Sequence, residues 1–230
     1  MKKQVVIVFM ISLLGNIVFA EETFEGFEIR VIRPRNYSKT GRVEVGFDGV
    51  SVTNQTFVYT FMGRFSLNYH FNNEWAFLLS SYYGISEDKA EKTELKKSFD
   101  IATLVTRTKF FVDGEIGWAP IYGKFQLGGG NLIYYDTHIT VGPSFAGIEY
   151  LRDHCRVDLN LGAVTKSYPA VVVGAGQQYY LSQHSSLKWG IKNHLIFYNP
   201  LDGGCSDGES DTTTDLLQNV TLQFGYSVFI

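Results

Sequence analysis

Apolar and polar side chains alternate with a period of two through most of the chain after residue 42. The longest such run spans Phe57–Phe71, fifteen residues in which odd-numbered positions are aromatic, Leu or Gly and most even-numbered positions are polar. Strict alternation of this kind predicts a β-strand with one apolar and one polar face. The run is also far longer than the roughly 5–6 residues of a typical strand in a soluble protein.

The same alternation, less complete, predicts seven further strands. They are expected at Arg42–Val50, Trp75–Gly84, Lys109–Leu127, Leu132–Pro143, Ala170–Leu181, Leu187–Phe197 and Asn219–Ile230. Within Lys109–Leu127 the apolar parity changes near Pro120, which predicts a bulge or bend there. The total is about eight strands, and a membrane-entering hairpin within Ala146–Tyr168 would raise it to ten.

The connections between these strands alternate in length. Three are short (Asn72–Glu74, Gly128–Asn131 and Ser182–Ser185) and three are long (Ser86–Thr108, Ala146–Tyr168 and Asn199–Thr213), while Ser51–Gln55 is a short exception among the long ones. Short periplasmic turns and long external loops are typical of an all-β, antiparallel up-and-down transmembrane barrel of the bacterial outer membrane. A soluble β-sandwich whose aromatic faces form the core is the alternative.

The first twenty residues have the organisation of an export signal. Lys2 and Lys3 precede an apolar run at Val5–Leu14, and Val18-Phe19-Ala20 is a suitable cleavage site. A single membrane anchor is the alternative, although the apolar run is short for spanning. We therefore expect residues 1–20 to be a removed signal peptide, residues 21–41 a periplasmic N-terminal segment, and residues 42–230 the barrel.

Composition agrees with this assignment. The 230 residues include 20 Lys and Arg against 23 Asp and Glu, and 15% are aromatic. Such a chain is too aromatic for a disordered protein, and it lacks the basic excess of a nucleic-acid binder. Its mean hydropathy of −0.03 is the average expected of strands that have one apolar and one polar face. The apolar face is expected to contact outer-membrane lipid, which is the main expected partner.

Strand parity places a set of ionisable side chains of both signs inside the barrel. The expected lumen set is Glu44, Asp48, Arg64, Lys124, Asp136, His138, Lys188, Lys192 and His194. The interior of an eight-stranded barrel is just wide enough to be filled by its own side chains. We expect these groups to pair and plug the lumen, which favours a structural or partner-docking barrel over a porin-like channel, alone or as an oligomer.

Several short segments also carry a family resemblance. They are Ile29–Ile32 followed by Lys39–Glu44, then Leu67–Phe71, Pro120–Phe125, and Val173–Gly176 before Tyr179–Leu181. On these segments the chain resembles the small outer-membrane β-barrel domain family found in gliding and predatory Gram-negative bacteria. The resemblance implies a barrel fold and an outer-membrane location. Most of that family has no assigned activity, while some members look like porin-type or oligomeric barrels and others like parts of gliding machinery.

Candidate chemistry is sparse. His184-Ser185 is the one His–Ser dipeptide and lies in a predicted periplasmic turn, while His154 follows Asp153 in a predicted external loop without a serine partner. A lipid-modifying enzyme is therefore the least favoured function. The five His and two Cys show no metal-ligand spacing, and we expect no catalytic, cofactor or metal site.

Cys155 and Cys205 both fall in predicted external loops. In an oxidising compartment they are candidates for a disulfide joining two loops, and two separate free thiols are the alternative. The segment Glu21–Tyr37 could be a strand that docks a periplasmic or envelope protein, or a disordered lead-in. A second copy of the chain is the other possible protein partner.

Overall fold

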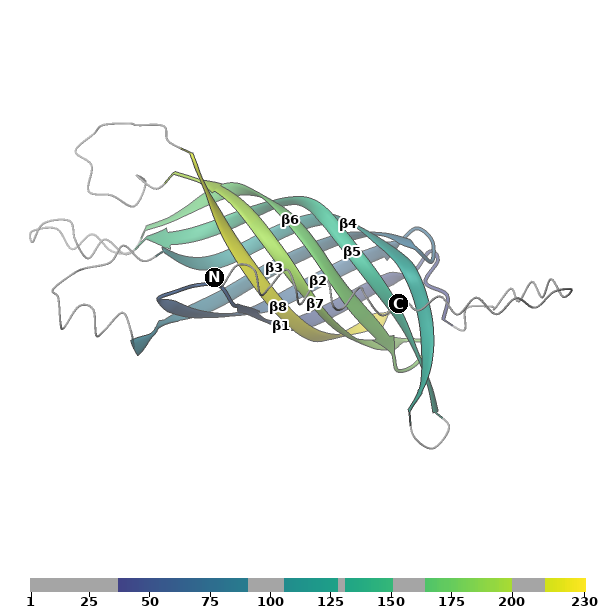
Figure 1. The fold of residues 1–230 in the computed structure, drawn as a ribbon. Helices are drawn as coiled ribbons and strands as arrows, with labels where there is room; N and C mark the ends of the chain where they lie inside the picture. Colours follow the sequence, from purple (N-terminus) through teal and green to yellow (C-terminus); the bar gives the residue numbers. More distant parts are fainter. Residues whose placement is uncertain (1–36, 91–105, 128–130, 151–163, 200–213) are drawn as a thin grey trace, which may run out of the picture. The chain divides into compact units, whose positions relative to one another are not determined.

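The computed structural model describes residues 37–90, 106–127, 131–150, 164–199 and 214–230. The chain divides into two units, residues 1–36 and 37–230, and the second is the barrel. Its strands form one closed ring in which each strand pairs antiparallel with the next along the chain, and β8 pairs with β1 (Figure 1). The predicted all-β, up-and-down barrel is confirmed.

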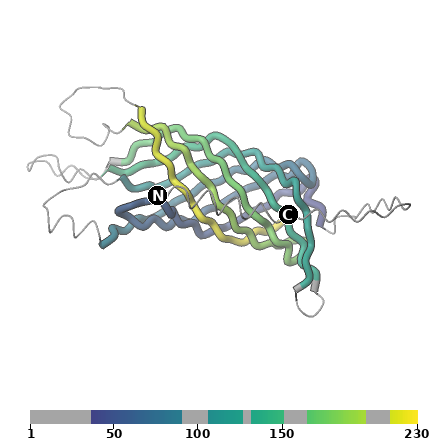
Figure 2. Tube along the Cα trace, viewed as in Figure 1, coloured from purple at the N-terminus to yellow at the C-terminus, as the bar shows by residue number. Residues whose placement is uncertain are grey.

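The strands are long. They are β1 Val43–Val52, β2 Val58–His70, β3 Trp75–Asp88, β4 Thr106–Leu127, β5 Asn131–Tyr150, β6 Val164–Tyr180, β7 Ser185–Tyr198 and β8 Asp215–Phe229. The shortest has 10 residues and the longest 22, and a tilted strand needs about 9–11 residues to cross a bilayer. Figure 2 shows the tilted strands winding around the ring.

Among the described residues the ring has the predicted eight strands, and the ten-strand alternative is not found. β5 and β6 extend into both ends of the stretch expected as a loop or an extra hairpin, and they pair with each other as far as Tyr150 and Val164. Pro143 lies inside β5, and the pairing of β5 with β4 is interrupted beside it, between Ser144 and Val141. Proline has no N–H to donate, so the barrel tolerates it at the cost of a local gap in one ladder.

Nearly all the strands extend further at one end of the barrel than the pattern predicts. We call this the long-loop end, where β1 ends and β2 begins, and the opposite end, with the turns at residues 71–74 and 181–184, the short-turn end. Near the long-loop end the inward positions are themselves apolar, for example Val52, Tyr150 and Ile196. The alternation on which the prediction depends is therefore lost there.

The bend predicted near Pro120 is confirmed, because the pairing of β4 with β5 shifts register between Trp118 and Ile121. β3 pairs with β4 only up to the pair Trp75 and Trp118. The remainder of β4 and the start of β5 form a hairpin that extends past β3 and projects beyond the ring in Figure 1.

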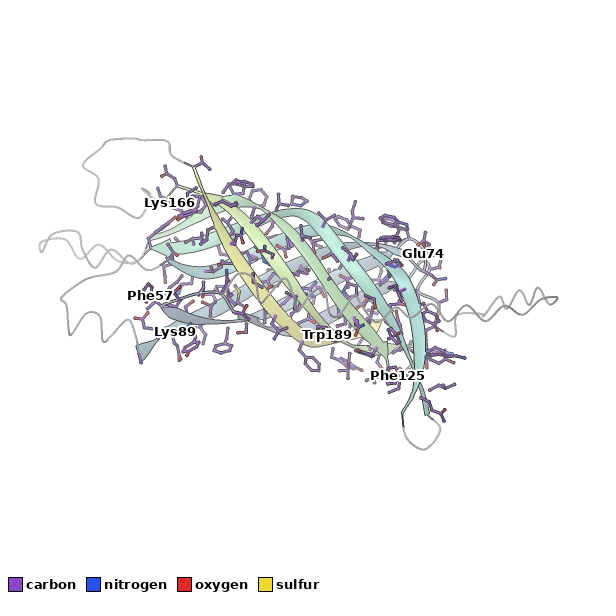
Figure 3. All side chains as sticks on the ribbon, viewed as in Figure 1. Phe57, Glu74, Lys89, Phe125, Lys166 and Trp189 are labelled. Atoms are coloured by element: carbon purple, nitrogen blue, oxygen red, sulfur yellow. The ribbon has the colours of Figure 1, made fainter. Side chains whose placement is uncertain are left out.

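The two faces of the sheet differ as the parity predicts. Outward side chains are large and apolar, and Phe47, Phe61 and Phe224 are each more than half exposed, whereas inward positions of the same strands are buried. Figure 3 shows side chains standing out all around the ring. Among the residues that the structure describes, no helix is long and apolar enough to cross a membrane.

Candidate functional site

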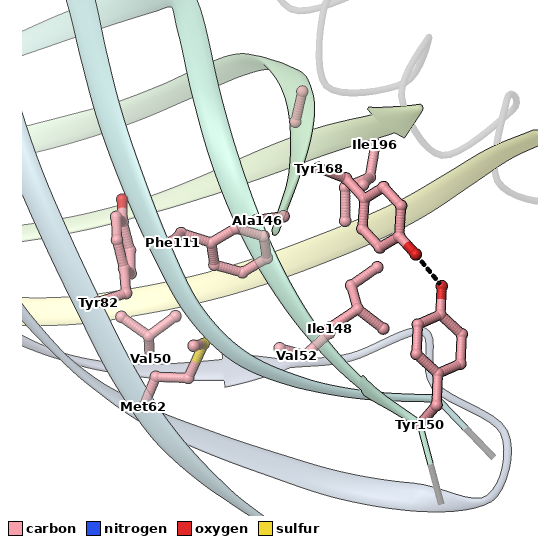
Figure 4. Close-up of a cluster of buried hydrophobic side chains, with 11 residues drawn as sticks. Val50, Val52, Met62, Tyr82, Phe111, Ala146, Ile148, Tyr150, Tyr168 and Ile196 are labelled. Atoms are coloured by element: carbon pink, nitrogen blue, oxygen red, sulfur yellow. Dashed lines mark hydrogen bonds between the residues drawn. The ribbon is translucent and has the colours of Figure 1, made fainter. Parts of the chain in front are cut away.

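The long-loop half of the barrel interior is filled by an apolar cluster (Figure 4). Its members are Val50, Val52, Met62, Tyr82, Phe111, Ala146, Ile148, Tyr150, Tyr168, Ala170 and Ile196. The Tyr150 hydroxyl donates a hydrogen bond of 3.0 Å to the Tyr168 hydroxyl, which satisfies one polar group of each ring. The paired ionisable groups predicted to plug the lumen therefore do not fill this half of it.

Arg64 organises the layer of polar groups beneath the apolar cluster. Its guanidinium donates to Asp48 Oδ2 at 2.9 Å and to Ser80 Oγ at 2.8 Å, and it lies 5.5 Å from the centroid of the Tyr82 ring. These partners belong to β1 and β3, on either side of the strand that carries Arg64. The fork of guanidinium donors therefore ties three neighbouring strands together inside the ring.

A second ion pair in this layer crosses the lumen. Lys192 Nζ on β7 donates to Glu115 on β4 and to the Tyr82 hydroxyl at 3.2 Å. The side chains of Lys192 and Glu115 are 3% and 0% exposed. Both charges are thus neutralised within the protein, as buried charges must be.

Asp113 and His194 form a third pair beside the apolar cluster. His194 Nε2 lies 3.1 Å from Asp113 Oδ2, and Ser144 Oγ donates to Asp113 Oδ1 at 2.6 Å. The His194 ring stacks on Phe111 with 4.0 Å between centroids. Although these residue types occur in hydrolases, the carboxylate lies between the serine and the histidine, so the serine has no histidine base.

Glu44 is the centre of a further cluster nearer the short-turn end. Its carboxylate lies 2.8 Å from His70 Nε2 and 2.9 Å from Lys188 Nζ, and it accepts a hydrogen bond of 3.1 Å from Gln178 Nε2. The four residues come from β1, β2, β6 and β7. One carboxylate therefore links strands on several sides of the lumen.

A polar cavity lies among these pairs, toward the short-turn end. It is lined by Lys39, His70, His138 and Lys188, among others, and has a volume of about 50 Å³. Since one water needs roughly 10–15 Å³ of such space, the cavity has room for about three to five waters. The apolar cluster separates it from the long-loop end.

The predicted lumen residues differ in how deeply the structure buries them. Glu44, Asp48, Arg64, Asp136, Lys188, Lys192 and His194 are buried inside the ring. His138 is partly exposed and lines the cavity. Lys124 is exposed.

Lys124 is a correction to the predicted set. It lies opposite Tyr134, in the part of the β4–β5 hairpin beyond the register shift that follows Trp118. The ring itself ends near that level, because β3 has no residues facing β4 beyond Trp118. Parity assigns a side chain to the inward face of its strand, but the lumen does not extend along the whole strand.

The sequence carried a signal for some residues that were not in the predicted set. His70, Asp113 and Glu115 are buried ion-pair partners, and each has the inward parity of its predicted strand. Lys39 is also buried, 4% exposed, in an ion pair with Asp136. It precedes the first alternating segment, so no periodicity pointed to it.

Other candidates lie elsewhere. Cys155, Cys205 and His154 fall outside the described residues, so the disulfide stays a prediction. His184 is exposed in a turn at the short-turn end, where its backbone N–H donates to Ser182 Oγ at 3.2 Å. Within the described ranges, no group of three or more His, Cys, Asp or Glu is arranged to hold a metal ion.

No protein-family model matches the chain, and no curated protein matches it. Solved bacterial barrels are similar to it in fold. The N-terminal β-barrel domain of Pseudomonas aeruginosa OprF aligns at 11% identity and TM-score 0.45 over 83% of this chain and 98% of that one. Neisserial surface protein A aligns at 11% identity and TM-score 0.46 over 81% of this chain and 94% of that one. Outer membrane protein OprG from Pseudomonas aeruginosa aligns at 8% identity and TM-score 0.47 over 84% of this chain and 98% of that one.

These likenesses are distant, and the assignment to a barrel rests on the closed ring of this chain itself. That ring confirms the small up-and-down barrel implied by the family resemblance. The link to gliding or predatory bacteria stays a prediction.

Proposed function

We propose that this chain is an outer-membrane β-barrel with a structural or partner-docking role and a lumen plugged by its own side chains. The observation that carries the proposal is the closed interior, with an apolar cluster at one end and buried ion pairs such as Arg64–Asp48 and Lys192–Glu115 beneath it. A conducting pore needs a continuous wide aqueous path. Here the polar cavity has room for only a few waters.

The outer face supports the membrane location. A soluble protein rarely exposes apolar patches larger than a few hundred Å², whereas this barrel exposes aromatic and aliphatic side chains on every strand. Lipid covers such a face without cost, and the short turns then face the periplasm. Membrane fractionation, together with a shift in gel migration on boiling, tests this location, and a protein that stays soluble after lysis would contradict it.

A charge on the outer face is expected to destabilise the barrel in lipid. Val112 lies opposite Ser81, at the middle of β3, and is 41% exposed. Val112→Arg should lower the free energy of unfolding by about 2–4 kcal/mol, the cost of a basic side chain near the bilayer midplane. Denaturant titration in vesicles measures it, with Val112→Ile as the matched control. An equal stability of the two variants would indicate that this face does not meet lipid.

The purified barrel is expected to show no conductance above background in planar bilayers. The apolar cluster leaves no path for ions, because a charge crossing it would lose its hydration without gaining a partner. Bilayer recording of the folded protein at several concentrations checks this result. Discrete current steps would favour the alternative, a porin-like channel formed alone or as an oligomer.

The proposal assigns no reaction to the chain. Contact with other envelope proteins is assigned to the external connections, the N-terminal segment before β1, or a second copy of the chain. Co-purification of a cross-linked partner that is lost when residues 21–36 are deleted would identify the N-terminal segment as the docking element.

A further inference from the structure

The residues immediately before β1, Tyr37–Gly41, cross the short-turn mouth of the barrel. Lys39 Nζ donates to Asp136 Oδ2 on β5 at 2.5 Å. The Tyr37 ring stacks on Tyr180 of β6, with 5.3 Å between centroids and 11° between planes. In a ring of eight strands β5 stands opposite β1, so this short segment reaches from the wall it enters to the wall across the lumen.

The near end of the segment is held by backbone bonds. The Gly41 N–H donates to the His70 carbonyl at 2.8 Å, and the Arg42 N–H to the Lys39 carbonyl at 3.0 Å. The Lys39 N–H donates to Asn73 Oδ1 at 2.9 Å. Gly41 has a φ of 72°, a conformation that glycine adopts without the strain of a side chain. The chain therefore turns sharply out of β1 and over the mouth.

The far end of the segment depends on one buried ion pair and a ring stack. Lys39 is 4% exposed and Asp136 is 1% exposed, and Asp136 Oδ2 also accepts a bond of 2.6 Å from the Tyr180 hydroxyl. Lys39 lines the polar cavity together with His138 and Lys188. Its side chain thus lies between the cavity and the solvent at the short-turn end.

We propose that Tyr37–Gly41 is a strap that closes the short-turn mouth, latched by Lys39 to Asp136, and that its release opens the polar cavity to solvent from that side only. The apolar cluster keeps the long-loop end closed, so release hydrates the cavity without creating a pore. The assignment of this mouth to the periplasmic side rests on the proposed function, whereas the latch itself can be tested in detergent.

The test measures how fast a buried reporter becomes accessible. Thr140 lines the cavity and is 2% exposed, so Thr140→Cys is introduced with Cys155→Ser and Cys205→Ser, and its reaction with a small charged thiol reagent is followed on the folded barrel in detergent. Lys39→Gln should raise the rate by about tenfold or more, because a charge-assisted hydrogen bond that holds the closed state is lost. Exchanging the charges, with Lys39→Asp and Asp136→Lys together, should restore a slow rate.

Lys124→Gln is the matched control, because it changes an exposed lysine at the same short-turn end of the barrel. It should leave the rate of the thiol reaction unchanged. Heat-modifiable migration verifies that each variant is folded. Tyr37→Ala, which removes the ring stack and leaves both charges paired, gives a second test and should also raise the rate. Folded Lys39→Gln and Tyr37→Ala barrels that react as slowly as the parent would overturn the strap. A soluble location would instead contradict the proposed function and leave this result standing.

Discussion

Arg64→Met is expected to lower the free energy of unfolding by about 3–5 kcal/mol, the usual cost of removing one partner of a buried ion pair. The substitution keeps most of the side-chain length but leaves the Asp48 carboxylate, 1% exposed, without its cationic partner. It also removes the donor to Ser80 Oγ and the cation that lies over the Tyr82 ring. Denaturant titration of the folded barrel in vesicles, followed by the shift in gel migration, measures the loss.

Removing both charges should recover most of that loss. Arg64→Met combined with Asp48→Leu replaces the pair by apolar groups of similar size, which is often neutral for a buried pair. Arg64→Lys should recover only part of the stability, because an ammonium group lacks the fork that reaches two acceptors at once. A double variant as unstable as Arg64→Met would show that the cost comes from lost packing, with the unpaired carboxylate contributing little.

Arg107 provides the matched control, since it forms the same type of pair in an exposed setting. Arg107 donates to Asp88 at 2.6 Å, and the two side chains are 19% and 36% exposed. Arg107→Met should cost no more than about 1 kcal/mol, because water screens an exposed pair. Equal losses for Arg64→Met and Arg107→Met would contradict the assignment of Arg64 to a buried layer of the lumen.

The sequence was sufficient to predict the inward face of those strands in which polar and apolar side chains alternate clearly. That prediction needs only the alternation of side chains along a strand, and it placed Glu44, Arg64 and Lys192 on the inward face, where the structure buries them. It also located the bend near Pro120, because a change of parity within one strand requires an extra residue in the ladder.

Partners inside the lumen could not be predicted in the same way. Lys192 and Glu115 are 77 positions apart in sequence and lie on strands that are not neighbours in the ring. Their meeting depends on the stagger of every intervening strand pair, which a single sequence does not reveal. For the same reason parity alone did not show that the lumen ends before Lys124, or that Lys39 closes it.

The apolar half of the lumen was the other feature that the pattern concealed. Parity identifies the inward face of a strand only where the inward side chains are polar. They are polar only where they contact other polar side chains inside the ring. At the long-loop end, the inward side chains Val50, Phe111 and Ile148 pack on one another instead. Beside Phe111 the flanking positions Phe110 and Val112 are apolar as well, so the alternation that distinguishes the inward face disappears there.

Phe111→Ala is therefore expected to be among the most destabilising apolar substitutions, at about 3–5 kcal/mol. Phe111 is 0% exposed, stacks on His194 and contacts Tyr82 edge to face at 5.9 Å between centroids. Truncation removes the transfer energy of the ring and leaves a cavity beside the Asp113–His194 pair. Denaturant titration in vesicles measures the cost, and Phe111→Leu should retain more than half of the stability that alanine loses.

Phe145 is the matched control for this prediction. It lies on β5 directly opposite Val112, on the outer face, and is 58% exposed. Phe145→Ala loses only the transfer of a ring from water into lipid, about 1.5–3 kcal/mol, since fluid acyl chains fill the space that the ring leaves. The larger cost expected at Phe111 is then the cost of the cavity that alanine leaves in a packed lumen. Equal costs at the two positions would mean that the long-loop half of the interior is loosely filled and open to water.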